Sequence, residues 1–208
     1  MVASALLLAG SAFAQQTSSR SQRAKNQVSP ADRAFLQEVS QDNLAEIKTA
    51  KMVEQKTSDP AIREYTRNLI NDHTKAEEQL STMATSLGIS LVRQPNAKQA
   101  ATYDKLKSLS GKQLDTAFVK DQLQDHKNDI KKFDDVLANS QDSTVKHYAA
   151  MQLPHLQDHI RLGEDLAGSM NMNGRAGLNM PTEAVSTQAL NRGSQNMNAK
   201  NRPAPRPY

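Results

Sequence analysis

The chain of 208 residues has no cysteine and no tryptophan, and aromatic residues make up only 4% of it. The lack of cysteine excludes structural disulfides and thiolate metal ligands. The scarcity of aromatics removes the stacking platforms that single-stranded nucleic acid needs. Hydrophobic residues make up 37% of the chain, so we expect a small core with polar flanks.

The formal net charge of +4 arises at the two ends of the chain. Residues 31–167 contain 18 Lys/Arg and 21 Asp/Glu, whereas residues 168–208 contain five basic residues and one acidic residue. A folded basic surface is therefore not expected, and we predict no nucleic-acid partner.

The first fourteen residues, MVASALLLAGSAFA, are typical of a secretory signal peptide. A short apolar stretch ends in Ala12-Phe13-Ala14, a small-x-small cleavage signature, although the usual positive start is missing. The alternative is a buried N-terminal strand or helix. We predict an exported protein, periplasmic or secreted, with association with the outer membrane left open. No second apolar run follows, so no transmembrane segment is expected once the signal is removed.

Composition divides the rest of the chain into three parts. Residues 15–28 are polar and predict a disordered linker, and residues 29–167 carry the folded domain. Residues 168–208 are rich in Met, Asn and Pro and predict a disordered tail. Methionines in that tail, such as Met170 and Met172, offer thioethers to Cu(I), but low-complexity disorder is the preferred interpretation.

The folded domain is predicted to consist of four long helices and one short one. Its helix boundaries are marked by N-cap residues before proline, by a glycine C-cap and by a capping-box spacing. These signals are Ser29-Pro30, Asp59-Pro60, Gly88, and Ser110 with Gln113. The predicted helices cover residues 30–55, 60–88, 97–109, 110–139 and 142–168.

The lengths of the connections predict how the helices are arranged. The first and last pairs of long helices have short links, so each pair should be antiparallel. More than twenty residues connect the second long helix to the third, which is enough to run the length of the bundle. The sequence therefore predicts an all-α, ferritin-like, up-down-down-up four-helix bundle with a long crossover that contains the short helix.

Asp-His pairs recur on three of the predicted long helices, and each histidine falls on an otherwise apolar seam. The first long helix has no histidine, but its seam contains Glu46. All four positions lie about 14 to 17 residues into their helices, so in this topology they share one level. We call these four residues the polar layer: Glu46, His73, His126 and His159.

Two interpretations of the polar layer remain open. Imidazole and carboxylate are suitable ligands for a divalent ion such as Zn, Fe, Mn or Cu. Alternatively, the glutamate satisfies the histidines without metal, and the layer fixes the register of the helices.

Several nearby residues are candidate auxiliaries on helical spacing grounds. Additional metal ligands are predicted three or four residues from a layer histidine, and the aspartates of the Asp-His pairs are predicted to support the layer by hydrogen bonds. A solvated face is the alternative for those aspartates. The auxiliary ligands are Glu77, Asp129 and His155, and the supporting aspartates are Asp72, Asp125 and Asp158.

Di-iron enzymes need Glu-x-x-His on two helices, and that motif is absent from this sequence. Ile70, Leu123 and Leu156 stand three residues before the layer histidines. We therefore predict no catalytic or cofactor-binding residues, leave the cofactor open with a divalent metal ion as the candidate, and favour a non-enzymatic protein.

Residues 31–167 resemble a bacterial family known as domain of unknown function 4142, whose members are often labelled predicted outer membrane proteins. The resemblance rests on the segments NLAEI, DPAIR, NDHTK, LGI and LPHLQDH, in that order. It implies a ferritin-like four-helix bundle and a cell-envelope location, but no established activity. Two hypotheses follow: a binding or stress-related envelope protein with an envelope partner or a homo-oligomeric state, and a metal-binding protein.

Overall fold

The structure, a computed structural model, describes residues 28–170 and confirms the all-α prediction for them. Five helices and no strand are found in this range: α2 (Pro30–Lys56), α3 (Pro60–Ser86), α4 (Ala97–Lys107), α5 (Gly111–Asn139) and α6 (Ser143–Ser169). The predicted signal peptide, nearly all of the linker and the tail from residue 171 lie outside the described residues.

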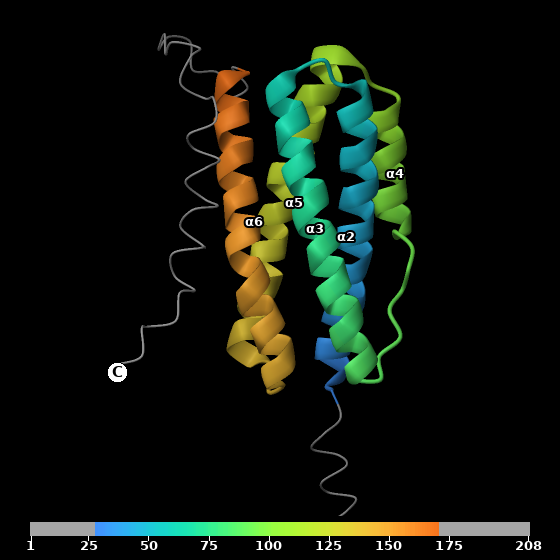
Figure 1. Cartoon of the computed structure of the whole chain (residues 1–208), viewed down its shortest axis with the longest axis vertical. Coiled ribbons are helices and arrows are strands. Elements are labelled where there is room, and N and C mark those ends of the chain that lie inside the picture. Colours follow the sequence, from blue (N-terminus) through green and yellow to red (C-terminus); the bar gives the residue numbers. More distant parts are fainter. Residues whose placement is uncertain (1–27, 171–208) are drawn as a thin grey trace, which may run out of the picture. The chain divides into compact units, whose positions relative to one another are not determined.

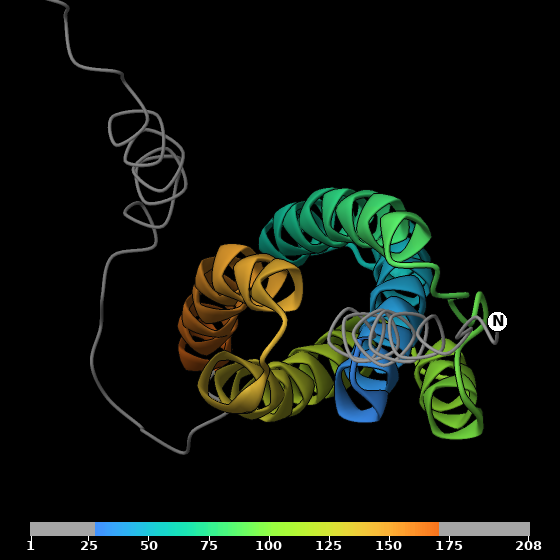
Figure 2. The ribbon, with the colours of Figure 1, turned by 90° about the horizontal axis from the view of Figure 1, so that it is seen from below.

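The helices form two antiparallel hairpins, α2 with α3 and α5 with α6 (Figure 1). Between the hairpins the chain returns along the bundle through α4, so α3 and α5 run in the same direction (Figure 1). Seen along the bundle, the four long helices surround a common interior, and α4 packs outside it against α2 and α5 (Figure 2). One side chain from each long helix can therefore reach the same point.

Helix starts follow the cap signals in the sequence. The Ser29 hydroxyl accepts a hydrogen bond from the backbone at the start of α2, and the Asp59 carboxylate does the same for α3. Asp142 caps α6 in the same way. The short α4 begins with a reciprocal capping box between Asn96 and Gln99, in which each side chain meets the other residue's backbone amide.

The end of α3 and the start of α5 differ in how well the sequence predicted them. Gly88 follows the end of α3 with a positive φ of 66°, as a C-terminal cap glycine does. The capping box predicted at Ser110 is wrong: its side chain makes no cap hydrogen bond. The chain enters α5 through Gly111 at a φ of 53°, and this turn leaves the Ser110 hydroxyl away from the first-turn amides.

Two apolar clusters occupy opposite ends of the bundle. One surrounds Phe35, Leu80 and Phe133, and the other surrounds Leu69 and Phe118. The polar layer lies between them on all four long helices, since each of its members separates residues of one cluster from residues of the other along its helix. The layer is therefore sealed above and below by packed side chains.

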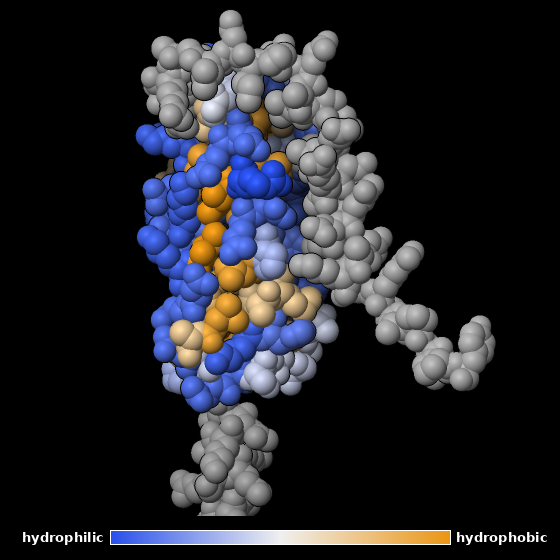
Figure 3. All heavy atoms as spheres, turned by 90° about the vertical axis from the view of Figure 1, so that its left-hand side faces the viewer, coloured by the Kyte–Doolittle hydropathy of each residue, from blue (hydrophilic) through white to orange (hydrophobic). Residues whose placement is uncertain are grey.

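The surface is largely polar. On the side that carries α6, apolar atoms form only a narrow band between hydrophilic residues (Figure 3). Among the described residues, the exposed large hydrophobics are Val92 and Met151. None of the helices between residues 28 and 170 is long and apolar enough to cross a bilayer.

Close packing of α6 against α3 and α5 depends on Gly163. A Cβ atom at this position would lie 3.0 Å from Leu123 Cδ2 and 3.2 Å from the Tyr65 hydroxyl oxygen. That hydroxyl donates a hydrogen bond to the backbone carbonyl of His159 at 3.1 Å. The absence of a side chain at Gly163 thus helps to fix the position of a layer histidine.

We expect Gly163→Ala to lower the free energy of unfolding by about 1–3 kcal/mol, because the added methyl overpacks the contact of α6 with α3 and α5. Chemical denaturation monitored by circular dichroism measures this change. Gly168→Ala is the matched control on the same helix, since nothing lies within 4 Å of its Cβ position, and it should leave stability unchanged or raise it by up to about 1 kcal/mol. Equal effects of the two substitutions would contradict the packing role of Gly163.

Candidate functional site

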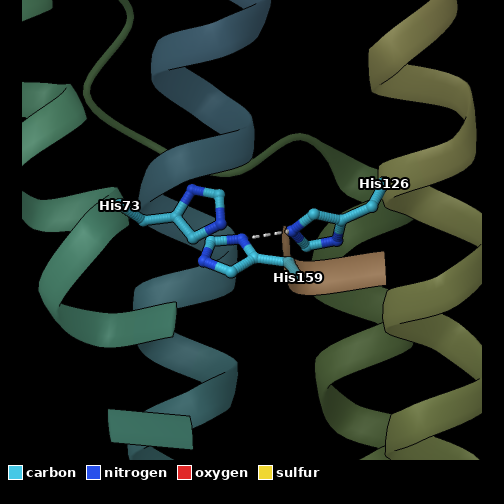
Figure 4. A group of neighbouring side chains, drawn as sticks. All are labelled: His73, His126 and His159. Carbon is cyan, nitrogen blue, oxygen red and sulfur yellow. Dashed lines mark hydrogen bonds between the residues drawn. The ribbon is translucent and has the colours of Figure 1, made fainter. Parts of the chain in front are cut away.

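The structure brings the four residues of the polar layer together, one from each long helix. Glu46 comes from α2, His73 from α3, His126 from α5 and His159 from α6. The four residues are between 0% and 6% exposed. The rings of the three histidines lie within one small volume between the helices (Figure 4).

Distances within the layer are short enough for a shared ligand. Glu46 Oε2 lies 2.6 Å from His73 Nε2 and 3.6 Å from His126 Nε2. His126 Nε2 lies 3.0 Å from His159 Nδ1 (Figure 4). One ring nitrogen from each histidine lies within 4.8 Å of the corresponding atoms of the other two.

The outer nitrogen of His73 is fixed as a donor. Its Nδ1 lies 3.0 Å from Asn43 Oδ1, an oxygen that can only accept. The orientation of the Asn43 amide is set by Glu77, whose Oε2 lies 3.4 Å from Asn43 Nδ2. Glu77 also accepts from the Ser40 hydroxyl at 2.8 Å and pairs with Arg93 at 3.3 Å. The proton of neutral His73 therefore sits on Nδ1, and Nε2 presents a lone pair to the interior.

His126 and His159 are held in the same way. His126 Nδ1 lies 2.9 Å from the backbone carbonyl of Gln122, and this acceptor fixes the proton on Nδ1. His159 Nε2 lies 3.2 Å from Asp72 Oδ2, an ionised carboxylate whose pKa is below its usual value. With its proton directed at Asp72, His159 presents the lone pair of Nδ1 to His126.

Convergence of these lone pairs is unfavourable without a positive charge between them. Two ring nitrogens 3.0 Å apart, each carrying a lone pair, repel unless a proton or a cation lies between them. Glu46 Oε2 and His73 Nε2 approach to 2.6 Å, yet neither atom has a hydrogen-bond partner of suitable direction. At this distance a protonated His73 forms an ion pair with the Glu46 carboxylate.

The pKa values of the four layer residues are shifted mainly by burial and by the charges within the layer, that of Glu46 above all. Burial would raise the pKa of Glu46, but the neighbouring histidines, above all His73, outweigh it and lower that pKa to about 2. Burial lowers the pKa of His126, and it lowers the pKa of His159 to about 4 against the opposing effect of Asp72. For His73 the Glu46 charge outweighs burial and raises the pKa. The result is a carboxylate paired with His73, whose pKa is raised, beside two imidazoles whose pKa values are lowered.

The three predicted auxiliary ligands lie around the layer rather than in it. Glu77 orients Asn43, as described above. His155 Nδ1 lies 3.7 Å from Asp72 Oδ2, so His155 and His159 approach the same aspartate. Asp129 pairs with Lys132 at 3.2 Å.

The three aspartates of the Asp-His pairs have three different environments. Asp72 contacts His159, as a supporting residue should. Asp125 lines a cavity beside the layer. Asp158 is exposed and pairs with Arg161 on its own helix at 3.5 Å, so it supports no histidine.

An acidic cavity of about 330 Å³ opens beside the layer, between α2, α4 and α5. Glu46 and Gln122 are part of its wall, so the cavity reaches the layer itself. On the opposite side, a space of about 20 Å³ touches His73 and His159, which is room for a single water. The acidic cavity is lined by Glu38, Asp42, Ala45, Glu46, Thr49, Asn96, Lys98, Gln99, Thr102, Asp121, Gln122, Asp125, Asn128, Asp129 and Lys132.

The sequence reasoning missed the acceptors that orient the histidines and most of the acidic cavity. Asn43 is a buried residue of α2, but no sequence pattern pairs it with a histidine. The backbone carbonyl of Gln122 has no sequence signal. The cavity did have a sequence signal, because acidic residues recur at intervals of four on two of the helices that line it.

Comparisons with known proteins concern both the family and the fold. The model of the family described as "Domain of unknown function (DUF4142)" matches residues 17–166. No curated protein matches the chain. Among solved structures, a DUF305 fragment from Deinococcus radiodurans is similar with a TM-score of 0.62 and 15% identity, covering 69% of this chain and 99% of its own.

A second similar structure is the "putative secreted protein DUF305" from Streptomyces coelicolor. Its TM-score is 0.60 at 16% identity, and the match covers 73% of this chain and 97% of that one. At these identities both likenesses concern the fold alone.

The raised pKa of Asp129 predicts a stability change that depends on pH. Burial, followed by the charges of Glu46 and Asp42, raises this pKa from 3.8 to about 7. The ionised carboxylate therefore destabilises the folded state, by an amount that is absent below pH 3.8, grows as the pH rises and is complete above pH 7. Asp129→Asn removes this cost.

We expect Asp129→Asn to be more stable than the wild type by on the order of 1–2 kcal/mol at pH 8, with the difference vanishing near pH 4. Lost pairing with Lys132 keeps the gain small. Denaturant titrations across this pH range measure it. Asp134→Asn, at an exposed position of the same helix, should show no such trend, and a gain that is independent of pH would contradict the assignment.

Proposed function

The chain belongs to the family of domain of unknown function 4142, and we propose that it is a metal-binding helical bundle of the bacterial cell envelope. The ion is held by three imidazole nitrogens and one carboxylate oxygen. These ligand atoms are His73 Nε2, His126 Nε2, His159 Nδ1 and Glu46 Oε2.

One observation carries the proposal: the outer nitrogen of every layer histidine is occupied by an acceptor, which directs the inner lone pairs at one point. Metal-bound histidines in proteins show this pattern, with the second ring nitrogen donating to a carbonyl or carboxylate. The atoms are separated by 2.6 to 3.6 Å where they are nearest neighbours. Tetrahedral metal bonds of about 2.0–2.2 Å put ligand atoms roughly 3.3–3.6 Å apart, so Glu46 and His73 would have to separate by about 0.7 Å or more.

The donor set indicates the class of ion. Imidazole nitrogens favour Zn²⁺, Cu²⁺, Fe²⁺ and Mn²⁺ over Ca²⁺ and Mg²⁺. The absence of thiolates removes the softest ligands. Within this group, three imidazoles and one carboxylate give the highest affinity for Cu²⁺ and Zn²⁺.

Burial favours a non-enzymatic role. Four protein ligands complete a tetrahedral site, as in structural zinc centres, whereas catalytic centres keep a position open for water or substrate. The layer is sealed by an apolar cluster at each end. We infer storage, transfer or sensing of a metal, or stabilisation of the fold by it, rather than turnover.

We also propose a topology for the bundle and a location for the protein. We infer a ferritin-like, up-down-down-up bundle, supported by the parallel course of α3 and α5 (Figure 1). Export is supported by the signal-like segment at residues 1–14 and by the description of the Streptomyces coelicolor relative as a secreted protein.

A metal-free polar layer is the second candidate. It is favoured by the approach of His126 Nε2 to His159 Nδ1, which a single shared proton makes a hydrogen bond. In that case His159 donates from both nitrogens and carries a positive charge against Asp72. The lowered pKa of His159 opposes this arrangement at neutral pH.

We expect Zn²⁺ and Cu²⁺ to raise the melting temperature of the untagged, chelator-stripped protein. Ligand at 100 times its dissociation constant adds about 2.7 kcal/mol to the free energy of unfolding. His126→Gln should abolish the shift, because it removes one inner nitrogen. Differential scanning calorimetry with and without metal measures the effect.

His147→Gln is the matched control, since His147 is exposed on α6, and it should keep the full shift. Glu46→Gln provides a second test if His126→Gln does not fold, and it should weaken the shift. A wild-type protein with no shift, or a shift that His147→Gln loses, would contradict metal binding at the layer.

A further inference from the structure

The crossover segment, residues 87–96, joins α3 to α4 and is fastened to α2 on its way (Figure 1). Two glutamines of α2, one helical turn apart, donate hydrogen bonds to backbone carbonyls of the segment. Gln37 Nε2 donates to Ser90 at 3.2 Å, and Gln41 Nε2 donates to Gln94 at 3.0 Å. The backbone of the segment is therefore held in place, and so are the side chains that it carries.

Arg93 is the side chain of the crossover segment that reaches toward the bundle interior. Its Nη1 lies 3.3 Å from Glu77 Oε1, and its Nη2 donates to Ser81 Oγ at 2.8 Å. The Arg93 side chain is 60% exposed, but the Glu77 side chain is only 10% exposed. This ion pair thus differs from a pair of two exposed groups, because loss of the arginine would leave a largely buried carboxylate without its countercharge.

The two oxygens of Glu77 have different partners. Oε1 faces Arg93 and accepts from the Ser40 hydroxyl at 2.8 Å. Oε2 lies 3.4 Å from Asn43 Nδ2. An ionised carboxylate can only accept hydrogen bonds, so the amino group of Asn43 turns toward Glu77. The carbonyl oxygen of Asn43 consequently turns toward His73, whose Nδ1 is 3.0 Å away.

The orientation of the Asn43 amide decides what His73 offers to the polar layer. With Oδ1 as the acceptor, the proton of neutral His73 sits on Nδ1, and Nε2 keeps its lone pair. With the amide reversed, an amino group would face Nδ1, and the proton would sit on Nε2 instead. Nε2 lies 2.6 Å from Glu46 Oε2, so a proton there would join the two atoms and occupy the direction that a metal ion needs.

We propose that Arg93 and Glu77 are positioning residues of the polar layer: acting through Asn43, they hold the proton of His73 on Nδ1 and keep Nε2 available to a metal ion. Hydrogen-bond partners of metal-bound histidines change metal affinity by about 10–100-fold. The crossover segment thereby belongs to the site, although two side chains separate Arg93 from His73. Its effect on metal affinity rests on the proposed function, whereas the orientation of His73 does not.

Glu77→Gln distinguishes a positioning role from simple packing, because the new amide has the same shape as the carboxylate. A guanidinium group can only donate, so Arg93 should attract the oxygen of the new amide and leave its amino group facing Asn43. Two amino groups cannot form a hydrogen bond with each other. The Asn43 amide should therefore reverse, and the proton of His73 should move to Nε2.

Nuclear magnetic resonance of the full-length, untagged, metal-free protein with isotope-labelled histidine tests this orientation. Nitrogen chemical shifts report which ring nitrogen carries the proton, and His73→Gln assigns the signals. At alkaline pH, where the imidazole is neutral, we expect the proton on Nδ1 in the wild type and on Nε2 in Glu77→Gln. The same proton position in both folded proteins, checked by circular dichroism, would overturn the proposal.

The double variant Glu77→Gln/Arg93→Gln isolates the part played by the arginine without any metal. Nothing then dictates the orientation of the new amide, so a population of His73 with its proton on Nδ1 should reappear. A proton that stays entirely on Nε2 in the double variant would overturn the role of Arg93.

Titration with Zn²⁺ gives a second measurement. We expect the dissociation constant to rise about tenfold or more in Glu77→Gln, and about threefold to tenfold in Arg93→Gln, which acts one step further away. Arg93→Lys retains the charge and should restore most of the affinity. Arg67→Gln is the matched control, because Arg67 also pairs with a glutamate, Glu54 of α2 at 2.8 Å, but is exposed. The control should change the affinity less than twofold.

The remaining outcomes separate this proposal from the proposed function. Unchanged affinity in Arg93→Gln, or an equal loss in Arg67→Gln, would overturn the role of Arg93. If Glu77→Gln does not fold, the loss in Arg93→Gln and its recovery in Arg93→Lys carry the test. A proton that moves in Glu77→Gln, together with a wild-type protein that does not bind Zn²⁺, would refute the proposed function and support the positioning of His73.

Discussion

The structure depends on how three buried histidines are oriented. Each gives its outer ring nitrogen to an acceptor on the periphery of the layer, and each therefore presents its inner nitrogen to Glu46 and to the other histidines. Polar groups buried this deeply are tolerated only when they are paired. Two apolar clusters seal the layer, so a cation or a proton at its centre completes the pairing and links all four long helices.

Much of this arrangement could be predicted from the sequence because local signals agreed with one another. Caps such as Ser29 and Asp59 fixed the helix starts, and the seams fixed the side of each helix that faces inward. The length of the crossover then placed Glu46 and the histidines at one level, as the structure shows. That these residues bind a metal stays a prediction.

Contacts made across helices could not be predicted in the same way. Asn43 reaches His73 only because of the register of α2 against α3, and the Gln122 acceptor is a backbone group. The acidic cavity depends on α4, whose packing outside the bundle has no periodic signal. Ser110 failed as a capping residue because the left-handed turn at Gly111 decides its geometry. Asp158 resembles Asp72 in sequence but faces solvent.

X-ray absorption spectroscopy of the untagged protein loaded with one equivalent of Zn²⁺ tests the central claim most directly, because it reports the atoms bound to the metal. Our account predicts four light ligands at about 2.0–2.1 Å, with the outer-shell scattering of three imidazoles. A six-coordinate oxygen environment, or scattering from fewer than two imidazoles, would contradict it and leave the polar layer as a purely hydrogen-bonded element of the fold.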